Sequence, residues 1–187
     1  MVPVTRTSVR DYAALEDASA TRNQLIEGQI VAMAGATPRH NAISLNIAAW
    51  LRGALRGRPC RPYPSDQRVH VLATGLDTYP DVTVICGELV RSTDDPRATT
   101  NPTLIVEVLS PSTETYDRGA KWRHYQRIPS LREYLLVSSE EPRVERFFLG
   151  DDGVWRYRLT THSEESVTLG ALDVTLPLAE IYADLPD

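Results

Sequence analysis

Cysteine and histidine are scarce in this chain, which argues against the protein classes that depend on them. Two cysteines and four histidines occur among 187 residues. Cys60 and Cys86 lack a C-x-x-C spacing, so the sequence predicts neither a zinc site nor a disulfide framework. We expect both cysteines to be reduced and packed as small apolar side chains in a cytoplasmic protein.

Long apolar runs and an export signal are missing as well. No stretch approaches the roughly 20 apolar residues that a membrane-spanning helix needs, so we expect no association with a membrane. Residues 1–15 (MVPVTRTSVRDYAAL) contain no apolar core of the kind found in signal peptides. Both absences agree with a cytoplasmic location.

The chain has fewer basic than acidic residues. The formal net charge is −5 and the isoelectric point is about 5.4. Nucleic-acid-binding proteins usually carry a basic footprint, although a local basic patch can oppose the net charge. The length suits one domain over residues 1–187, and 42% hydrophobic and 24% charged residues are ordinary for a globular protein.

Hydrophobic periodicity and turn residues divide the chain into helices and strands. An unbroken apolar run at residues 103–110 is typical of a central strand covered on both faces. The order of elements indicates one α/β or α+β domain with a mixed central sheet. The sequence predicts a helix capped by Thr7 or Ser8, a hairpin turning at Glu27-Gly28, a helix at 40–57, strands at 60–73, 78–88 and 103–110, a helix from Asp117 as N-cap to about Arg127, four strands after Pro129 and a last helical turn near the C-terminus.

Two carboxylates interrupt apolar strands. Glu107 stands inside TLIVEVL, and Asp81 follows Pro80 at the start of another strand. A glutamate is rarely buried unless it is paired, so the plainest interpretation is a structural ion pair for Glu107 and a turn role for Asp81. If the two strands are neighbours, however, the carboxylates converge and repel unless a cation bridges them. Mg²⁺ suits one or two carboxylates together with a substrate phosphate.

Lysine is the scarcest cation, because the 20 basic residues are nineteen arginines and one lysine, Lys121. Its compact ammonium on a flexible stem differs physically from a guanidinium. With Asp117 as N-cap, Lys121 would lie in the opening turns of a helix, where a cation opposes the helix dipole. Chance is the simple alternative, since one exposed lysine needs no explanation.

Asp81, Glu107 and Lys121 together form the PD…E…K arrangement of metal-dependent phosphodiester hydrolysis. The two carboxylates and the backbone carbonyl of Val108 would hold Mg²⁺, or Mn²⁺ in its place, and the metal would activate a bound water. Lys121 would orient that water or neutralise the charge that develops on the phosphate.

Longer motifs resemble those of one known family, from about Gln24 to Val137. They are LIEGQIVAM, YPDVTVIC, LIVEVLSPST and YDRGAKWRHYQRIPSLREYLLV. They resemble the Uma-two family of the PD-(D/E)XK nuclease superfamily. The resemblance implies a restriction-endonuclease-like core with a mixed sheet flanked by helices, and the activity of a restriction-type DNA endonuclease. It also implies that Asp81 and Glu107 bind the metal and that Lys121 is the catalytic cation.

Two departures from the pattern accompany this resemblance. The usual lysine position of the superfamily is Leu109 here, and the lysine is relocated to the next helix, at Lys121. Gln24 replaces a glutamate that is common in the family, which puts a ligand role at that position in doubt. Glu27 matches an acidic turn position of the family and is a secondary candidate with a structural alternative.

Further candidates are His40, Asp66 and a set of basic residues. His40 precedes a helix and could bind phosphate or contact the metal-bound water, or it could cap the helix. Asp66 could face the same cleft. Basic side chains could follow a phosphate backbone or form a solvated surface: Arg52, Arg56, Arg58, Arg61, Arg118, Arg123, His124, Arg127 and Arg132.

Three functions are compatible with these residues. The first is a Mg²⁺-dependent DNA endonuclease, for which a two-fold homodimer would match the two strands of a duplex. The second is a catalytically silent nuclease-fold protein that binds nucleic acid or a protein partner. The third is a structural protein in which Asp81, Glu107 and Lys121 form only a buried ion-pair cluster.

Overall fold

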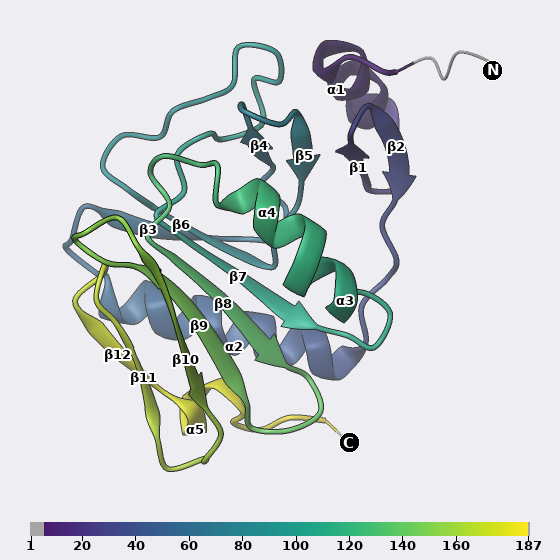
Figure 1. The fold of residues 1–187 in the computed structure, drawn as a ribbon. Helices are drawn as coiled ribbons and strands as arrows, with labels where there is room; N and C mark the ends of the chain where they lie inside the picture. The colour runs from purple at the N-terminus through teal and green to yellow at the C-terminus, as the bar shows by residue number, and fades with distance from the viewer. Residues whose placement is uncertain (1–5, 187) are drawn as a thin grey trace.

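A six-stranded mixed sheet forms the centre of the computed structural model, which describes residues 6–186 (Figure 1). Its strands are β3 (Cys60–Pro64), β6 (Val82–Cys86), β7 (Leu104–Leu109), β8 (Glu133–Ser138), β9 (Val144–Leu149) and β10 (Trp155–Thr160). The strand order is β10-β9-β8-β7-β6-β3, in which β7 and β8 are parallel and the other neighbours are antiparallel. The predicted mixed sheet is therefore confirmed.

Strand β7 is covered on both faces, as its unbroken apolar run predicts. All six of its residues are buried. Because successive side chains of a strand point to opposite faces, Leu104 and Val106 join one hydrophobic core, whereas Ile105 and Leu109 join another. Glu107 has the same parity as Ile105 and Leu109, so it lies on the second face.

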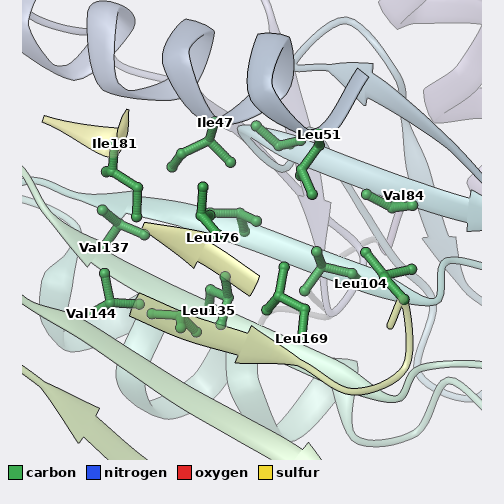
Figure 2. Close-up of a cluster of buried hydrophobic side chains, with 14 of the residues drawn as sticks. Ile47, Leu51, Val84, Leu104, Leu135, Val137, Val144, Leu169, Leu176 and Ile181 are labelled. Carbon is green, nitrogen blue, oxygen red and sulfur yellow. The ribbon is translucent and has the colours of Figure 1, made fainter. Parts of the chain in front are cut away.

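Helix α2 (Pro38–Ala54) covers the first face, behind the sheet in Figure 1. Thr37 is its N-cap, and the Oγ1 atom of Thr37 accepts a hydrogen bond of 3.2 Å from the backbone N–H of His40. Figure 2 shows the buried face of α2, with Ile47 and Leu51, above side chains of the sheet. The C-terminal elements complete this core: β11 (Ser166–Leu169), β12 (Val174–Pro177) and α5 (Leu178–Ile181).

A helical segment covers the second face, in front of β7 and β8 in Figure 1. It consists of α3 (Glu114–Tyr116), the π-helical turn η1 (Asp117–Lys121) and α4 (Trp122–Tyr125). Trp122 and Tyr134 stack here with ring centroids 5.2 Å apart. The expectation that Asp117 caps this helix is wrong. The helical backbone begins at Glu114, and the N–H of Asp117 already donates to the carbonyl of Thr113 at 2.9 Å.

The N-terminal part contributes helix α1 (Val9–Ala18) and part of a smaller sheet. Ser8 is the N-cap of α1 and accepts a hydrogen bond from the N–H of Asp11, as predicted. The predicted turn is formed by Glu27 and Gly28, both at positive φ (49° and 83°). The smaller sheet has the order β2-β1-β5-β4 and comprises β1 (Asn23–Ile26), β2 (Gln29–Ala32), β4 (Val69–Val71) and β5 (Leu76–Thr78).

No helix within residues 6–186 is long and apolar enough to cross a membrane. The expectation that the chain lacks an export signal rests partly on residues 1–5. Those residues lie outside the described part of the chain, as does residue 187.

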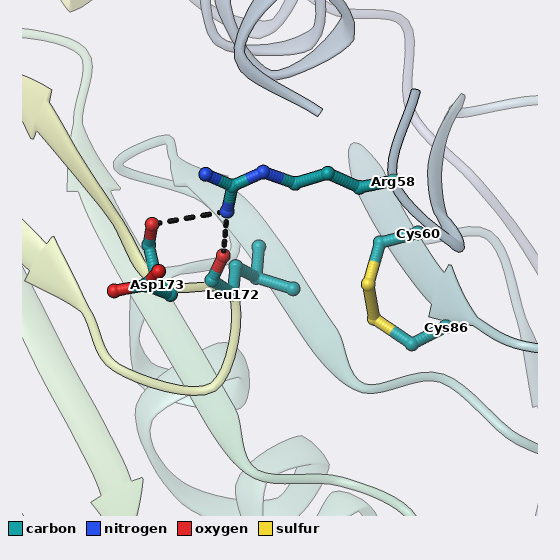
Figure 3. Close-up of a disulfide and its surroundings, with 5 residues drawn as sticks. All are labelled: Arg58, Cys60, Cys86, Leu172 and Asp173. Atoms are coloured by element: carbon teal, nitrogen blue, oxygen red, sulfur yellow. Dashed lines mark hydrogen bonds between the residues drawn. A yellow bond between two sulfur atoms is a disulfide. The ribbon is translucent and has the colours of Figure 1, made fainter. Parts of the chain in front are cut away.

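Cys60 and Cys86 form a disulfide, which corrects the expectation that both are reduced (Figure 3). The two residues are direct cross-strand partners where β3 pairs with β6. Their separation of 26 residues along the chain gives no sign of this contact, because strand pairing alone brings them together. Arg58 lies beside the disulfide, and its guanidinium donates to the carbonyls of Leu172 and Asp173.

Candidate active site

Asp81 is positioned by the pairing of β6 with β7. Val82 lies opposite Val106 in this antiparallel pair, so one further step along each strand brings Asp81 to Glu107. The backbone N–H of Val108 donates to Asp81 Oδ2 at 2.7 Å and fixes the carboxylate. The predicted convergence of the two acidic residues is therefore what the strand register produces.

Glu107 receives two donors from the helical segment that covers the second face. The hydroxyl of Tyr125 donates to Glu107 Oε1 at 2.7 Å, and Lys121 Nζ lies 2.7 Å from the same oxygen. The side chains of Lys121 and Glu107 are only 6% and 5% exposed. A buried carboxylate on a core strand is thus paired, as the cost of burying an isolated charge requires.

Lys121 is held by the π-helical turn, where its ammonium lies 3.3 Å from Asp117 Oδ1 as well as against Glu107. π-Helical turns are rare and recur at functional sites. With Asp81, the cluster contains three carboxylates and one ammonium. One lysine cannot neutralise three acids, so the ionised cluster has an excess of negative charge.

Burial and this excess of acids shift the protonation of the cluster. Desolvation raises the pKa of Glu107 to about 8; the ammonium of Lys121 opposes the shift, and the charges of Asp117 and Asp81 add to it. Desolvation alone would lower the pKa of Lys121, but the charges of Glu107 and Asp117 outweigh it and raise that pKa. Lys121 therefore keeps its proton, and burial favours the protonated form of Glu107.

His40 joins the cluster from the first turn of α2, where the cap formed by Thr37 fixes its backbone. Its Nε2 atom lies 3.3 Å from Asp81 Oδ2, and its side chain is 12% exposed. Burial would lower the pKa of His40. The hydrogen bond and charge of Asp81, together with the backbone carbonyl of Val108, outweigh burial and raise it. The Val108 carbonyl, which we expected to bind a metal, thus faces His40 as well.

A cavity of about 490 Å³ opens onto these groups. One wall is the segment 32–37, between β2 and α2, and another is the loop 110–113 that follows β7. Figure 1 shows both segments passing close to the C-terminal end of β7. The remaining lining residues are Gln24, His40, Tyr79, Asp81, Glu107, Val108, Tyr116, Asp117, Lys121 and Ser139.

The donors of this cluster fit a divalent cation. Asp81 Oδ1 and Glu107 Oε2 accept no hydrogen bond from the described residues, and both side chains line the cavity. No group of three or more His, Cys, Asp or Glu side chains within residues 6–186 is arranged to hold a metal. The available donors are two carboxylates, and Mg²⁺ is a cation that binds to one or two carboxylates together with water and a phosphate.

Two of the predicted candidates lie outside the cluster. Asp66 is 77% exposed on its side chain and pairs with Arg22, so it does not face the cavity. Glu27 is exposed in the turn between β1 and β2, and its backbone at positive φ forms part of that turn. Gln24 does line the cavity, and its Oε1 accepts a hydrogen bond of 3.1 Å from Thr78.

The predicted basic residues do not line the cavity either. Arg118 is held by the carboxylates of Glu114 and Glu145, which occupies its guanidinium. Arg58 is bound to backbone carbonyls near the disulfide. These two arginines therefore have structural contacts in place of the phosphate contacts that we considered.

Two residues of the site escaped the sequence prediction. Asp117 was predicted only as a helix cap and Tyr125 was not singled out, yet both contact the Lys121–Glu107 pair. The spacing of these residues along the chain could have identified them. Residues 117, 121 and 125 are four positions apart, so they share one face of a helix.

Comparison with known proteins agrees with this fold. The model of the Uma2 family, described as "Putative restriction endonuclease", matches residues 9–179. The chain belongs to the Uma2 family. Every residue of the cluster lies within the matched range, so the family resemblance seen in the sequence is confirmed.

Two similar proteins come from Synechocystis sp. The protein slr1290 is 34% identical over 183 residues, which are 98% of this chain and 95% of that protein. The protein sll1609 is 34% identical over 145 residues, which are 78% of this chain and 82% of its own length. The similarity to this Uma2 chain thus extends over nearly its whole length.

A solved structure shares the fold. It is a crystal structure described as "a putative nuclease belonging to DUF820" from Anabaena variabilis, with a TM-score of 0.77. The match covers 97% of this chain and 98% of that one at 15% sequence identity. At this identity, the likeness shows that the Uma2 chain has the fold of that protein.

Proposed function

We propose that this Uma2 chain is a metal-dependent endonuclease that hydrolyses phosphodiester bonds, with DNA as its substrate. One observation carries the proposal: Asp81 and Glu107 meet on adjacent strands at a cavity, with Lys121 Nζ 2.7 Å from Glu107 Oε1. The family description and that of the structural neighbour support a nuclease. A homodimer remains a prediction from the two-fold symmetry of duplex DNA.

Each residue of the cluster has a role in this proposal. Asp81 and Glu107 would hold Mg²⁺, or Mn²⁺ in its place, through the oxygens that accept no hydrogen bond from the described residues. When bound, the metal supplies Lewis acidity and lowers the pKa of a coordinated water. Lys121 keeps its proton and places a fixed positive charge beside the phosphate, where negative charge increases in the transition state.

Hydrolysis adds the oxygen of one water to phosphorus and breaks one ester P–O bond. The water loses a proton, and the leaving alkoxide gains one. His40 lies against Asp81 with a raised pKa, so it is suited to donate a proton or a hydrogen bond to a phosphate oxygen. Tyr125 keeps Glu107 Oε1 directed at the helical segment, and the other oxygen accepts no hydrogen bond from the described residues.

Cleavage of labelled DNA and RNA with Mg²⁺ or Mn²⁺ tests the proposal. We expect wild type to cut DNA, and Asp81→Asn and Glu107→Gln to lose that activity while remaining folded. The matched control is Asp66→Asn, which changes an exposed aspartate outside the cavity and should cut like wild type. Intact substrates under all conditions, or equal cutting by Glu107→Gln, would contradict the proposal; retained binding without cutting would indicate a catalytically silent nuclease fold.

A further inference from the structure

The reactive groups lie at the bottom of the cavity. The exposed fractions of the side chains are 5% for Glu107, 6% for Lys121, 12% for His40 and 16% for Asp81. A phosphate must therefore enter the cavity, whose walls include segment 32–37 and loop 110–113, before it reaches them. Access to this depth constrains the substrate, because the nucleotides on both sides of the phosphate must follow it.

The size of the cavity is that of a small-molecule site. Its volume of about 490 Å³ lies within the roughly 300–1,000 Å³ typical of ligand pockets. A phosphate with the sugar and base attached to it fits such a space. A paired and stacked duplex does not, because its second strand would have to enter too. Enzymes that modify a base inside a pocket meet the same constraint, and they take single-stranded substrates or extrude nucleotides from the duplex.

The charged residues that line the cavity also favour a single strand over a duplex. Lys121 and His40 are the basic side chains among the residues that line the cavity. Proteins that position duplex DNA spread many contacts from arginine, lysine and polar groups along both phosphate backbones. The polar lining here includes the hydroxyls of Ser110, Ser112 and Thr113, and Ser110 Oγ lies within hydrogen-bond distance of the other two. These groups suit one phosphate and its sugar.

An aromatic ring in the wall is available to a base. The ring of Tyr79 is already flanked by Arg22 and Arg68, each 5.7 Å from its centroid, and its hydroxyl donates to Glu16. Tyr116 has one such neighbour, Lys121 Nζ at 6.0 Å from the ring centroid, is only partly buried, and its hydroxyl has no hydrogen-bond partner among the described residues. Unpaired bases stack on such rings in proteins that bind single strands.

We propose that the cavity accepts an unpaired nucleic-acid segment, with Tyr116 as a stacking surface, and excludes fully paired duplex. This inference rests on the proposed function and specifies its substrate class, and it removes the argument for a homodimer, which depends on a duplex substrate. The reaction is the same hydrolysis, in which water adds to phosphorus and the alkoxide of the neighbouring nucleotide leaves with a proton.

The test compares four substrates with the full chain and Mn²⁺. They are bis(p-nitrophenyl) phosphate, a labelled single-stranded DNA, the same strand annealed to its complement, and a duplex with a central mismatched bubble. We expect the single strand and the bubble to be cut at least about tenfold faster than the paired duplex, since unpairing costs a few kcal/mol and each 1.4 kcal/mol is tenfold.

The outcomes separate this inference from the proposed function. Equal or faster cutting of the paired duplex overturns the inference and leaves the nuclease intact. Hydrolysis of the small diester with no cutting of nucleic acid also overturns it. If nothing is hydrolysed, the proposed function fails, and fluorescence anisotropy with Ca²⁺ then decides the inference: equal or tighter binding of the duplex overturns it, and tighter binding of the single strand supports it.

Variants of Tyr116 test the stacking surface in the same binding assay. Tyr116→Ala should weaken single-strand binding by at least about fivefold, the lower end for loss of one stacked base. Tyr116→Phe should bind like wild type, because the hydroxyl has no partner. Tyr116→Leu replaces the Ala variant if that one unfolds. Tyr157→Ala, which removes an exposed tyrosine of β10 outside the cavity, is the control; wild-type binding by Tyr116→Ala would contradict the role of the ring.

Discussion

Lys121 Nζ lies 2.7 Å from Glu107 Oε1, and both side chains are almost fully buried. The pair joins the central strand β7 to the π-helical turn that covers it. It therefore belongs to the core as well as to the candidate site. The two roles separate experimentally, because loss of the ammonium affects stability even when no metal or substrate is present.

Lys121→Met should destabilise the metal-free protein. The substitution leaves Glu107 and Asp117 buried without their cation, and breaking a buried pair in this way costs about 3–5 kcal/mol. Urea unfolding in the presence of a chelator measures the change. The double variant Lys121→Met/Glu107→Gln removes both charges and should recover part of the loss. Wild-type stability of Lys121→Met would show that the pair is not buried as described.

Tyr125→Phe should reduce catalysis more than binding. The substitution removes the hydroxyl that donates to Glu107 Oε1, which leaves the carboxylate less well oriented. We expect a lower kcat with little change in KM, and a loss of about 1–3 kcal/mol in unfolding free energy. The matched control is Tyr134→Phe, which removes a buried hydroxyl that donates to the backbone carbonyl of Asp117. Equal effects of the two variants on kcat would contradict a role for Tyr125 in positioning Glu107.

Asp77 should make stability depend on pH. Its side chain is fully buried 3.2 Å from His70 Nδ1. Burial raises its pKa from 3.8 to about 6, although His70 opposes the shift. The folded state thus binds a proton that the unfolded state releases, so the unfolding free energy falls as pH rises from about 4 to about 6.

The variant Asp77→Asn isolates this contribution. The difference in unfolding free energy between wild type and Asp77→Asn should fall by on the order of 3 kcal/mol across that window and stay constant above it. Urea unfolding at several pH values gives the difference. Subtraction removes the separate contribution of Glu107, whose pKa of about 8 extends to higher pH. A difference that is constant from pH 4 to pH 7 would refute this account of Asp77.

Removal of the disulfide should lower stability without affecting the site. Cys60→Ser/Cys86→Ser frees a loop of 26 residues, and such a crosslink typically contributes about 2–4 kcal/mol. Cys86 ends β6 at the opposite end from Asp81, so Mn²⁺ affinity should be unchanged. Alkylation before and after reduction, read by mass spectrometry, shows whether the bond is present. Thiols that react without a reductant would contradict it.

Sequence patterns predicted the central strand and singled out three residues of the candidate site because each carries a local signal. Glu107 stands out within an apolar run, Asp81 stands at a strand start, and Lys121 is unique in composition. The helix and strands around them follow from periodicity, which depends on near neighbours in the chain. The family motifs added the expectation that these residues lie in one place.

The features that the sequence did not predict depend on contacts between distant segments. Cys60 meets Cys86 only through the register of β3 and β6. Asp117 has the residue type of a helix cap, but the helix begins earlier, so the side chain faces Lys121 instead. Asp66 is a polar residue near a strand, and only the fold reveals that it points to Arg22 and away from the cavity.

The central claim is that Asp81 and Glu107 form a metal site, and Mn²⁺ binding tests it most directly. Paramagnetic resonance or calorimetry on purified wild type, Asp81→Asn and Glu107→Gln needs no knowledge of the substrate, and Asp66→Asn is the control. We predict about one or two bound ions in wild type and in the control, and loss of binding in the two site variants. Wild-type binding by Glu107→Gln, or no binding by wild type at millimolar Mn²⁺, would contradict the claim.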